Sequence, residues 1–247
     1  MIMKLVFRGR GLTGGLSILV VAASLLIIGG GNAAADFNIA EDAFCISNAP
    51  GYCFAMAAFA RWYYLNRAED PPLRKVLDKK TQTHIARQLQ EFYAKNLITL
   101  QADYCNAHQS DQTESFKRLA TALTNGEPRI VLLMNKGKSG PVLHAVLAYA
   151  WVPELKVLKI YDPNYNNRER IIDLERGEYT SLDITYHAIC FPEVLQDHNG
   201  LVRKMESLHD FYLENRLAAS PVPWRRAAST PADRPLETER YSRGPTR

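Results

Sequence analysis

The chain has 247 residues, of which 47% are hydrophobic, so it can bury one sizeable core. Its formal net charge of +4 is carried at the two ends, because residues 1–35 hold three basic residues and no acid and residues 217–247 hold six arginines against three acids. About −2 is left for the segment between them, which argues against nucleic acid as a partner, since enzymes of nucleic acids carry a basic patch on the folded domain.

Residues 1–35 have the pattern of a secretory signal peptide. Three basic residues precede an apolar run at residues 16–28, and the alanines at 33–35 come directly before Asp36. We therefore expect export, to the periplasm or out of the cell. The alternative is an uncleaved N-terminal anchor, in which neighbouring glycines extend the apolar run toward the roughly 20 residues that span a membrane. Contact with a membrane is expected only in that second case.

Residues 36–216 are expected to form one domain in which helices come first and strands follow. Helical patterns cover residues 53–67, 78–95, 112–123 and 201–216. Short apolar runs predict strands at residues 129–134, 143–151, 156–161, 170–174 and 184–191. This order predicts an α+β fold with a helical layer packed on an antiparallel sheet. Residues 217–247, rich in Arg, Pro, Ser and Thr, are expected to be a disordered tail.

The four cysteines show no metal-binding pattern. The chain contains neither C-x-x-C nor H-E-x-x-H, so we expect no metal and no other cofactor. In an oxidising compartment Cys45, Cys105 and Cys190 could supply one disulfide, and their spacing does not select the pair.

Cys53 lies where a loop containing Pro50 and Gly51 turns directly into a predicted helix. A thiol at this position meets the positive end of the helix dipole, which lowers its pKa and favours the nucleophilic thiolate. The alternative is an ordinary buried cysteine, because free cysteines are among the most buried residues.

His144 and Asp162 lie on two alternating apolar runs that flank Pro153, as in a β-hairpin. A turn centred on Pro153 places them directly opposite each other, with Cβ atoms about 4.5–5.5 Å apart. An aspartate at that distance fixes the tautomer and orientation of a catalytic histidine. The alternative is a half-buried His144 beside an Asp162 that only opens a turn. His187 is a competing base, although no simple turn places a carboxylate opposite it.

Taken together, these segments resemble papain-like cysteine peptidases. The sequence around Cys53, the His144-Ala145 pair that opens a strand, and the strand ending in Tyr-Asp162-Pro-Asn are most similar to the bacterial YopT/AvrPphB type. They are less similar to the papain-like domains that process double-glycine leaders. The resemblance covers roughly residues 45–165 and implies a papain-like fold with Cys53, His144 and Asp162 as a triad that cleaves amide bonds through a thioester.

One position departs from papain, where a glutamine six residues before the cysteine stabilises the oxyanion. That position is Ser47 here, and we expect Asn48 to donate to the oxyanion instead, together with the Cys53 N–H. The expected substrate is a protein or a peptide. Acyl transfer to an amine, as in a transglutaminase or deamidase, and a non-catalytic binding module with an unreactive Cys53 are the alternatives.

Overall fold

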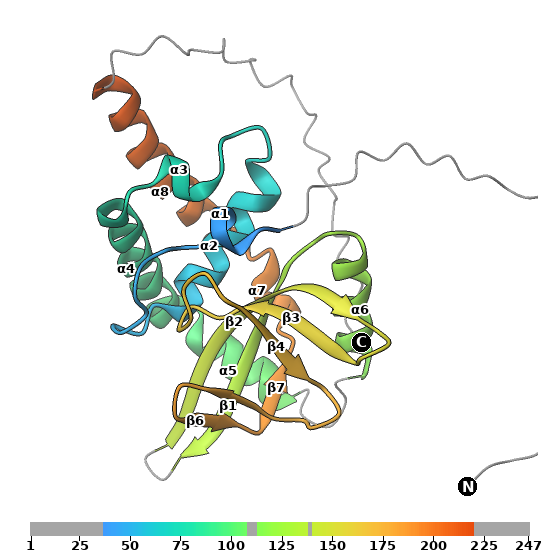
Figure 1. Cartoon of the computed structure of the whole chain (residues 1–247). Helices are drawn as coiled ribbons and strands as arrows, with labels where there is room; N and C mark the ends of the chain where they lie inside the picture. The colour runs from blue at the N-terminus through green and yellow to red at the C-terminus, as the bar shows by residue number, and fades with distance from the viewer. Residues whose placement is uncertain (1–36, 108–112, 138–139, 220–247) are drawn as a thin grey trace, which may run out of the picture. The chain divides into compact units, whose positions relative to one another are not determined.

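The structure, a computed structural model, describes residues 37–107, 113–137 and 140–219 (Figure 1). The predicted signal peptide and most of the predicted tail lie outside these residues. The helices within them are α1 (Ile39–Asp42), α2 (Cys53–Asn66), α3 (Leu73–Val76), α4 (Lys79–Asn96), α5 (Ile98–Ala107), α6 (Thr113–Thr124), α7 (Glu193–Gln196) and α8 (Asn199–Ala219). The strands are β1 (Arg129–Gly137), β2 (Gly140–Val152), β3 (Val157–Tyr161), β4 (Glu169–Asp173), β5 (Tyr179–Ser181), β6 (Ile184–Tyr186) and β7 (Ala188–Cys190). Of the helices described, none combines the length and apolar character that crossing a membrane requires.

The strands form one five-stranded sheet and one short hairpin. The larger sheet has the order β4-β3-β2-β1-β7, and every neighbouring pair in it is antiparallel. β5 and β6 pair only with each other. Helices that come first in the chain, followed by an antiparallel sheet, confirm the predicted α+β class.

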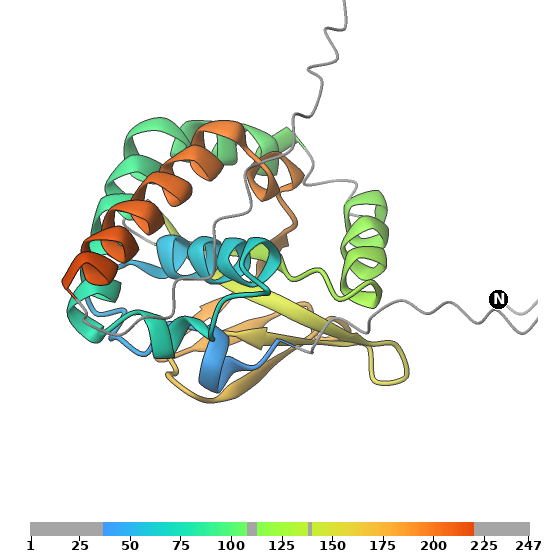
Figure 2. The same cartoon turned by 90° about the horizontal axis from the view of Figure 1, so that it is seen from above.

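Helix α2 packs on one face of the sheet and is buried along most of its length. Every residue from Phe54 to Tyr63 is buried, and the small side chains of Ala57 and Ala60 allow a close approach. The same core contains Leu132 of β1 and the β2 residues Ala145 and Leu147. α4 and α8 pack beyond α2, away from the sheet (Figures 1 and 2). Because full burial of a large apolar side chain contributes about 1.5–3 kcal/mol, this layer fixes the position of α2 firmly.

A buried arginine also fixes the direction in which α2 points. Arg61 donates from Nε to the carbonyl oxygen of Pro128 at 2.8 Å and from Nη1 to Asp197 Oδ1 at 3.1 Å. A buried guanidinium is tolerated only when it is paired and hydrogen-bonded in this way. The two contacts tie α2 to the start of β1 and to the end of α7.

The opposite face of the sheet packs against α6. Leu119 and Leu123 of α6 share a second core with Val131 and Leu133 of β1 and with Val146 of β2. Successive residues of a strand point to opposite faces, so β1 and β2 contribute alternate residues to the two cores. The helical layer predicted on one face therefore has a counterpart on the other.

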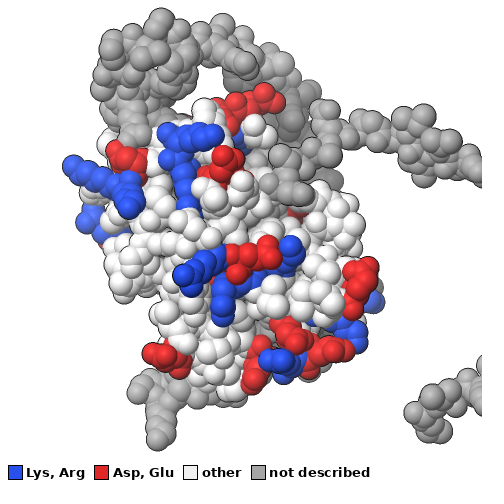
Figure 3. All heavy atoms as spheres, in the orientation of Figure 1, with Lys and Arg blue, Asp and Glu red and all other residues white. Residues whose placement is uncertain are grey.

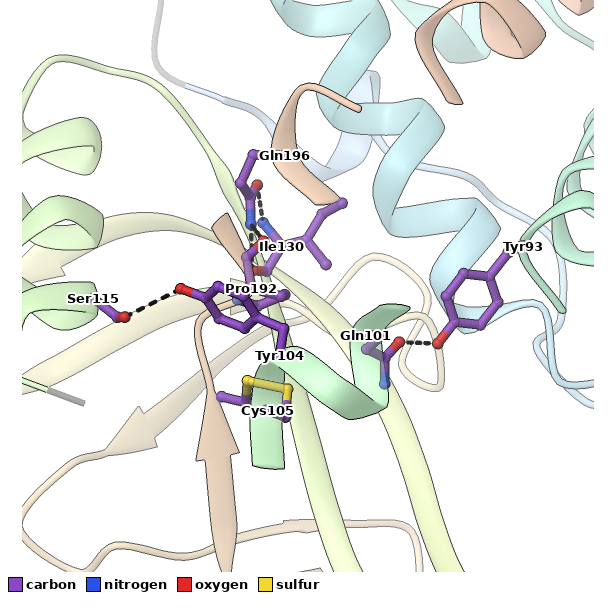
Figure 4. Close-up of a disulfide and its surroundings, with 9 residues drawn as sticks. Tyr93, Gln101, Tyr104, Cys105, Ser115, Ile130, Pro192 and Gln196 are labelled. Atoms are coloured by element: carbon purple, nitrogen blue, oxygen red, sulfur yellow. Dashed lines mark hydrogen bonds between the residues drawn. A yellow bond between two sulfur atoms is a disulfide. The ribbon is translucent and has the colours of Figure 1, made fainter. Parts of the chain in front are cut away.

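A disulfide between Cys105 and Cys190 joins α5 to β7, with the two Cα atoms 5.9 Å apart (Figure 4). Of the three candidate cysteines, only Cys45 is left free. The Tyr93 hydroxyl of α4 donates to Gln101 of α5 close by (Figure 4). These contacts hold α5 against its neighbours on two sides.

Parts of the predicted secondary structure are wrong. The single strand expected at residues 184–191 is two strands, of which β6 pairs with β5 and β7 pairs with β1. The break falls at His187, whose N–H donates to the Met134 carbonyl at 3.2 Å. α5 and β5 were not predicted, because α5 buries only two of its ten residues and β5 is three residues long.

Candidate active site

Cys53 is the first residue of α2 and is half-buried. A tight turn precedes it, in which Gly51 has φ +82° and donates its N–H to the Asn48 carbonyl at 2.7 Å. Such a φ favours glycine. Tyr52 precedes α2 without a side-chain cap, and the first helical bond runs from Met56 N–H to the Tyr52 carbonyl at 2.9 Å. The N–H groups at this end are therefore free of helical partners, and that of Phe54 is directed at the thiol.

His144 lies on β2 at a point where β2 has a neighbour on one side only. β1 pairs with the whole stretch from Gly140 to Ala148, whereas the pairing with β3 ends at Leu147 and Tyr161. By the alternation of the strand, His144 belongs to the face that packs against α6, and its ring stacks on Tyr186 with centroids 5.8 Å apart. The open edge of β2 next to His144 is where the Cys53 thiol meets the sheet, because the sulfur accepts from the Ala145 N–H and interacts with the His144 ring.

The carboxylate of Asp162 lies against the His144 ring. His144 Nε2 is 2.7 Å from Asp162 Oδ1, and both side chains are almost fully buried. Because Nε2 faces the carboxylate, Nδ1 is the ring nitrogen left for the thiol. The structure thus brings Cys53, His144 and Asp162 into one chain of contacts.

The predicted register of the β2–β3 hairpin is wrong, although its two key residues meet. The turn spans Pro153–Lys156 instead of centring on Pro153, and a β-bulge at Tyr149 shifts the pairing between Ala148 and Ala150. Asp162 follows the last pair of the ladder and reaches His144 diagonally. The predicted and observed registers differ by two residues at this point, and an even shift leaves a side chain on the same face of the sheet.

Four donors surround the Asp162 carboxylate. Oδ1 accepts from His144 Nε2 and, at 2.8 Å, from the N–H of Asn164. Oδ2 accepts from the Tyr179 hydroxyl at 2.8 Å and from the Ser181 hydroxyl at 2.7 Å. Tyr179 and Ser181 come from β5, which therefore closes the site from the side of the short hairpin. Their role has no counterpart in the sequence analysis, because β5 was not predicted.

Asn48 belongs to a polar chain that leads back to Asp162. Its Nδ2 donates to Asn164 Oδ1 at 2.7 Å, and Asn164 Nδ2 donates to the Ser181 hydroxyl at 2.8 Å. Asn164 Nδ2 also lies 3.4 Å from His144 Nε2, beside the His144–Asp162 hydrogen bond. One of the two amide hydrogens of Asn48 is thus directed at this cluster. The donation from Asn48 to an oxyanion stays a prediction.

These contacts shift the pKa values of all three groups toward their charged forms. Burial alone would raise the pKa of the Cys53 thiol, but the His144 ring and the N–H groups of Ala145 and Phe54 outweigh it and lower the pKa. Burial would lower the pKa of His144, but hydrogen bonds to Asp162 and Cys53 raise it to about 9. Burial would raise the pKa of Asp162, but its donors hold it below the usual range. A thiolate beside an imidazolium is therefore the favoured state.

The remaining candidates lie away from this chain of contacts. The His187 side chain is 65% exposed, and its Nδ1 lies 3.5 Å from Glu178 Oε2. Cys45 is half-buried, and its N–H donates to Gln82 Oε1 at 2.8 Å. Gln82 and Gln90, which contacts the start of α2 through the Ala55 N–H, are eight residues apart on α4, or about 12 Å. The two free thiols are therefore held at different points along α4.

Acidic and basic side chains lie near one another on the face of the domain drawn in Figure 3. Ion pairs such as Lys159–Glu169 at 3.3 Å and Lys117–Glu114 at 2.6 Å place opposite charges side by side. On the face that Figure 3 shows, basic side chains lie among acidic ones.

Comparisons with known proteins assign no function to this site. No family model matches the chain, and neither the curated proteins nor the solved structures contain a match.

Proposed function

We propose that this protein is an exported cysteine peptidase of papain-like type that uses Cys53 as nucleophile, His144 as acid and base, and Asp162 to orient His144. The observation that carries the proposal is the buried contact from Asp162 through His144 to a thiol at the start of a helix. A buried carboxylate–imidazole pair facing a thiol of lowered pKa is the arrangement that nucleophilic catalysis requires.

The proposed reaction has two steps. The Cys53 thiolate attacks the carbonyl carbon of an amide, and the negative charge moves to the carbonyl oxygen. The tetrahedral intermediate collapses as the C–N bond breaks and His144 gives its proton to the departing amine, which leaves a thioester on Cys53. His144 then takes a proton from water, the hydroxide displaces the thiolate, and a carboxylic acid is released. Asp162 stays ionised throughout and holds the ring in place.

Two further features support the papain-like and exported parts of the proposal. The nucleophile comes from a helical layer, whereas His144 and Asp162 come from an antiparallel sheet packed against it. The Cys105–Cys190 disulfide suits an oxidising compartment, in which such bonds persist. A protein or peptide is the proposed substrate.

The test is alkylation of the purified protein with limiting iodoacetamide at pH 6, mapped by mass spectrometry. A thiol at its ordinary pKa of about 8.5 is less than roughly one per cent ionised at pH 6, so fast labelling there reports a lowered pKa. Cys45 is the internal comparator, because it is free and half-buried like Cys53.

We expect Cys53 to label at least about ten times faster than Cys45, and His144→Ala to remove that advantage. Equal labelling of the two cysteines, or labelling of Cys53 that does not depend on His144, would contradict the proposal and favour a binding module.

A further inference from the structure

The inference concerns the N–H groups at the start of α2, where the oxyanion of the proposed reaction would form. A helix leaves its first N–H groups without helical partners, so each one needs another acceptor. The Phe54 N–H is directed at the Cys53 sulfur, and the Ala55 N–H donates to Gln90 Oε1 at 3.2 Å. Within the described residues the Cys53 N–H has no hydrogen-bond partner. It is therefore available to a substrate oxygen.

Gln90 lies on the face of α4 that contacts the first turn of α2. One turn further along α4, the Tyr93 ring stacks on Phe54 with centroids 3.8 Å apart, and burial, with a smaller contribution from the Cys53 charge, raises the pKa of Tyr93. With Oε1 held by the Ala55 N–H, the planar amide of Gln90 places its NH₂ group beside the first turn of α2. Gln90 is half-buried, and its NH₂ group has no acceptor among the described residues.

Gln82, two turns earlier on the same helix, shows what a purely structural glutamine looks like here. Its Oε1 also accepts a backbone N–H, from Cys45, but its Nε2 donates to the Leu77 carbonyl at 2.8 Å. Gln82 is fully buried and both ends of its amide are used. Gln90 likewise accepts a backbone N–H through Oε1, but its NH₂ group has no acceptor among the described residues.

We propose that the Gln90 amide donates to the oxyanion together with the Cys53 N–H. This rests on the proposed function, because it assigns a donor to the same reaction. Asn48, the donor expected from the sequence, instead directs one of its amide hydrogens to Asn164, on the Asp162 side of the site. Gln90 contacts the first turn of α2 through the Ala55 N–H, at the helix N-terminus, where the positive end of the dipole favours the developing negative charge.

Two probes separate this role from thiol activation. p-Nitrophenyl acetate acylates a thiolate through a tetrahedral oxyanion: the S–C bond forms, the C–O bond to p-nitrophenolate breaks, and p-nitrophenolate leaves with the electron pair. Iodoacetamide alkylates the same thiolate by displacing iodide, and no oxyanion forms. The rate of each reaction at Cys53 is measured by mass spectrometry, and their ratio reports oxyanion stabilisation.

Gln90→Ala is expected to slow acylation of Cys53 by about 10² to 10³-fold while alkylation stays within a factor of about three. Gln90→Glu separates donation from capping, because the carboxylate still accepts the Ala55 N–H but cannot donate. Loss of acylation relative to alkylation in both variants supports the donor role.

Several outcomes would overturn the proposal. If Gln90→Glu keeps the wild-type ratio of the two rates, Gln90 acts only as a cap. If Asn48→Ala, and not Gln90→Ala, lowers the ratio selectively, Asn48 is the donor. If wild-type Cys53 is alkylated rapidly at pH 6 but Gln90→Ala leaves its acylation unchanged, this inference falls and the proposed function stands. If the wild-type protein shows neither reaction, both fall.

Discussion

The buried carboxylate of Asp162 is stabilised by the number of its donors. An ionised group at 0% exposure loses its hydration, and this cost is offset only when its oxygens are hydrogen-bonded. His144, Tyr179, Ser181 and the Asn164 N–H supply those bonds. The orientation of His144 therefore depends on β5 as well as on the hairpin that carries His144 and Asp162.

Ser181→Ala removes one donor from Asp162 and one acceptor from Asn164. A hydrogen bond to a charged group contributes about 1.5–3 kcal/mol, so we expect the free energy of unfolding at pH 7 to fall by about that amount. Thr180→Ala is the matched control, because Thr180 is an exposed neighbour of Ser181 and its hydroxyl contacts that of Thr185 and not Asp162. Urea denaturation measures both variants, and equal losses would remove Ser181 from this role.

The effect of Ser181→Ala should depend on pH. Because the pKa of Asp162 is lower in the folded protein than in the unfolded chain, the stabilisation is present at neutral pH. It is lost as the pH falls through the folded-state pKa of Asp162. The difference between Ser181→Ala and wild type should therefore shrink in acid.

The pKa of His144 predicts how the site responds to alkali. The ring should titrate with a midpoint of about 9, which NMR of its ring protons measures directly. In Asp162→Asn the carboxylate charge is absent, so we expect this midpoint to move to lower pH. Because His144 then loses its proton at lower pH, it lowers the pKa of Cys53 less. The pH at which alkylation becomes fast should therefore rise. An unchanged alkylation profile would show that Asp162 does not act through His144.

At the residue scale, the sequence predicts the residues that stand in a recognisable motif or at a regular spacing. Cys53 stands out through the loop-to-helix pattern, and His144 and Asp162 through hairpin alternation. Tyr179, Ser181 and Gln90 have no such signal, because their roles come from contacts between segments far apart in the chain. Asn48 was found by its distance from Cys53 along the chain, but its contact with Asn164 arises only in the fold.

At the scale of elements, long periodic segments were predicted well and short ones were not. The helices α2 and α4 lie within a residue or so of their expected bounds, because α4 buries a regular face and α2 is an apolar segment buried from Phe54 to Tyr63. β6 and β7 were merged into one expected strand, since a continuous apolar run does not show that its two halves pair with different partners.

The bulge at Tyr149 compensates for an extra residue in β2. Pairs on the turn side of the bulge, such as Ala150 with Lys159, and pairs on the other side, such as Ala148 with Ile160, differ by one residue in register. Removing Tyr149 therefore leaves both sets of pairs intact and keeps His144 and Asp162 on one face. We expect the Tyr149 deletion to fold and to keep the fast labelling of Cys53.

Deletion of Leu147 is the matched control, because it shortens β2 by the same length. It would move Tyr149 into the buried position of Ala148 and Ala148 into that of Leu147, which is 0% exposed. Loss of the leucine alone costs about 2–5 kcal/mol, and the tyrosine adds overpacking. Thermal unfolding measures both deletions, and equal stability would contradict the role given to the bulge.

At the scale of the whole molecule, the candidate site lies where the helical layer meets the sheet. Cys53 comes from the layer fixed by the apolar core and by Arg61, whereas its partners come from β2, from the residues after β3 and from β5. An α+β class with helices before an antiparallel sheet followed from the order of periodic segments. The packing of α6 on the second face did not, because an amphipathic pattern does not indicate which face of a sheet it covers.

This division has a consequence for how the protein is made. The thiol belongs to an early part of the chain, whereas His144, Asp162 and Ser181 are synthesised much later. Until those later residues have been made and have docked, His144 cannot lower the pKa of the sulfur, and Cys53 in an unfolded chain has the modest reactivity of any exposed cysteine. The reactivity proposed for Cys53 is therefore absent during synthesis and during any passage in the unfolded state, and it appears only when folding is complete.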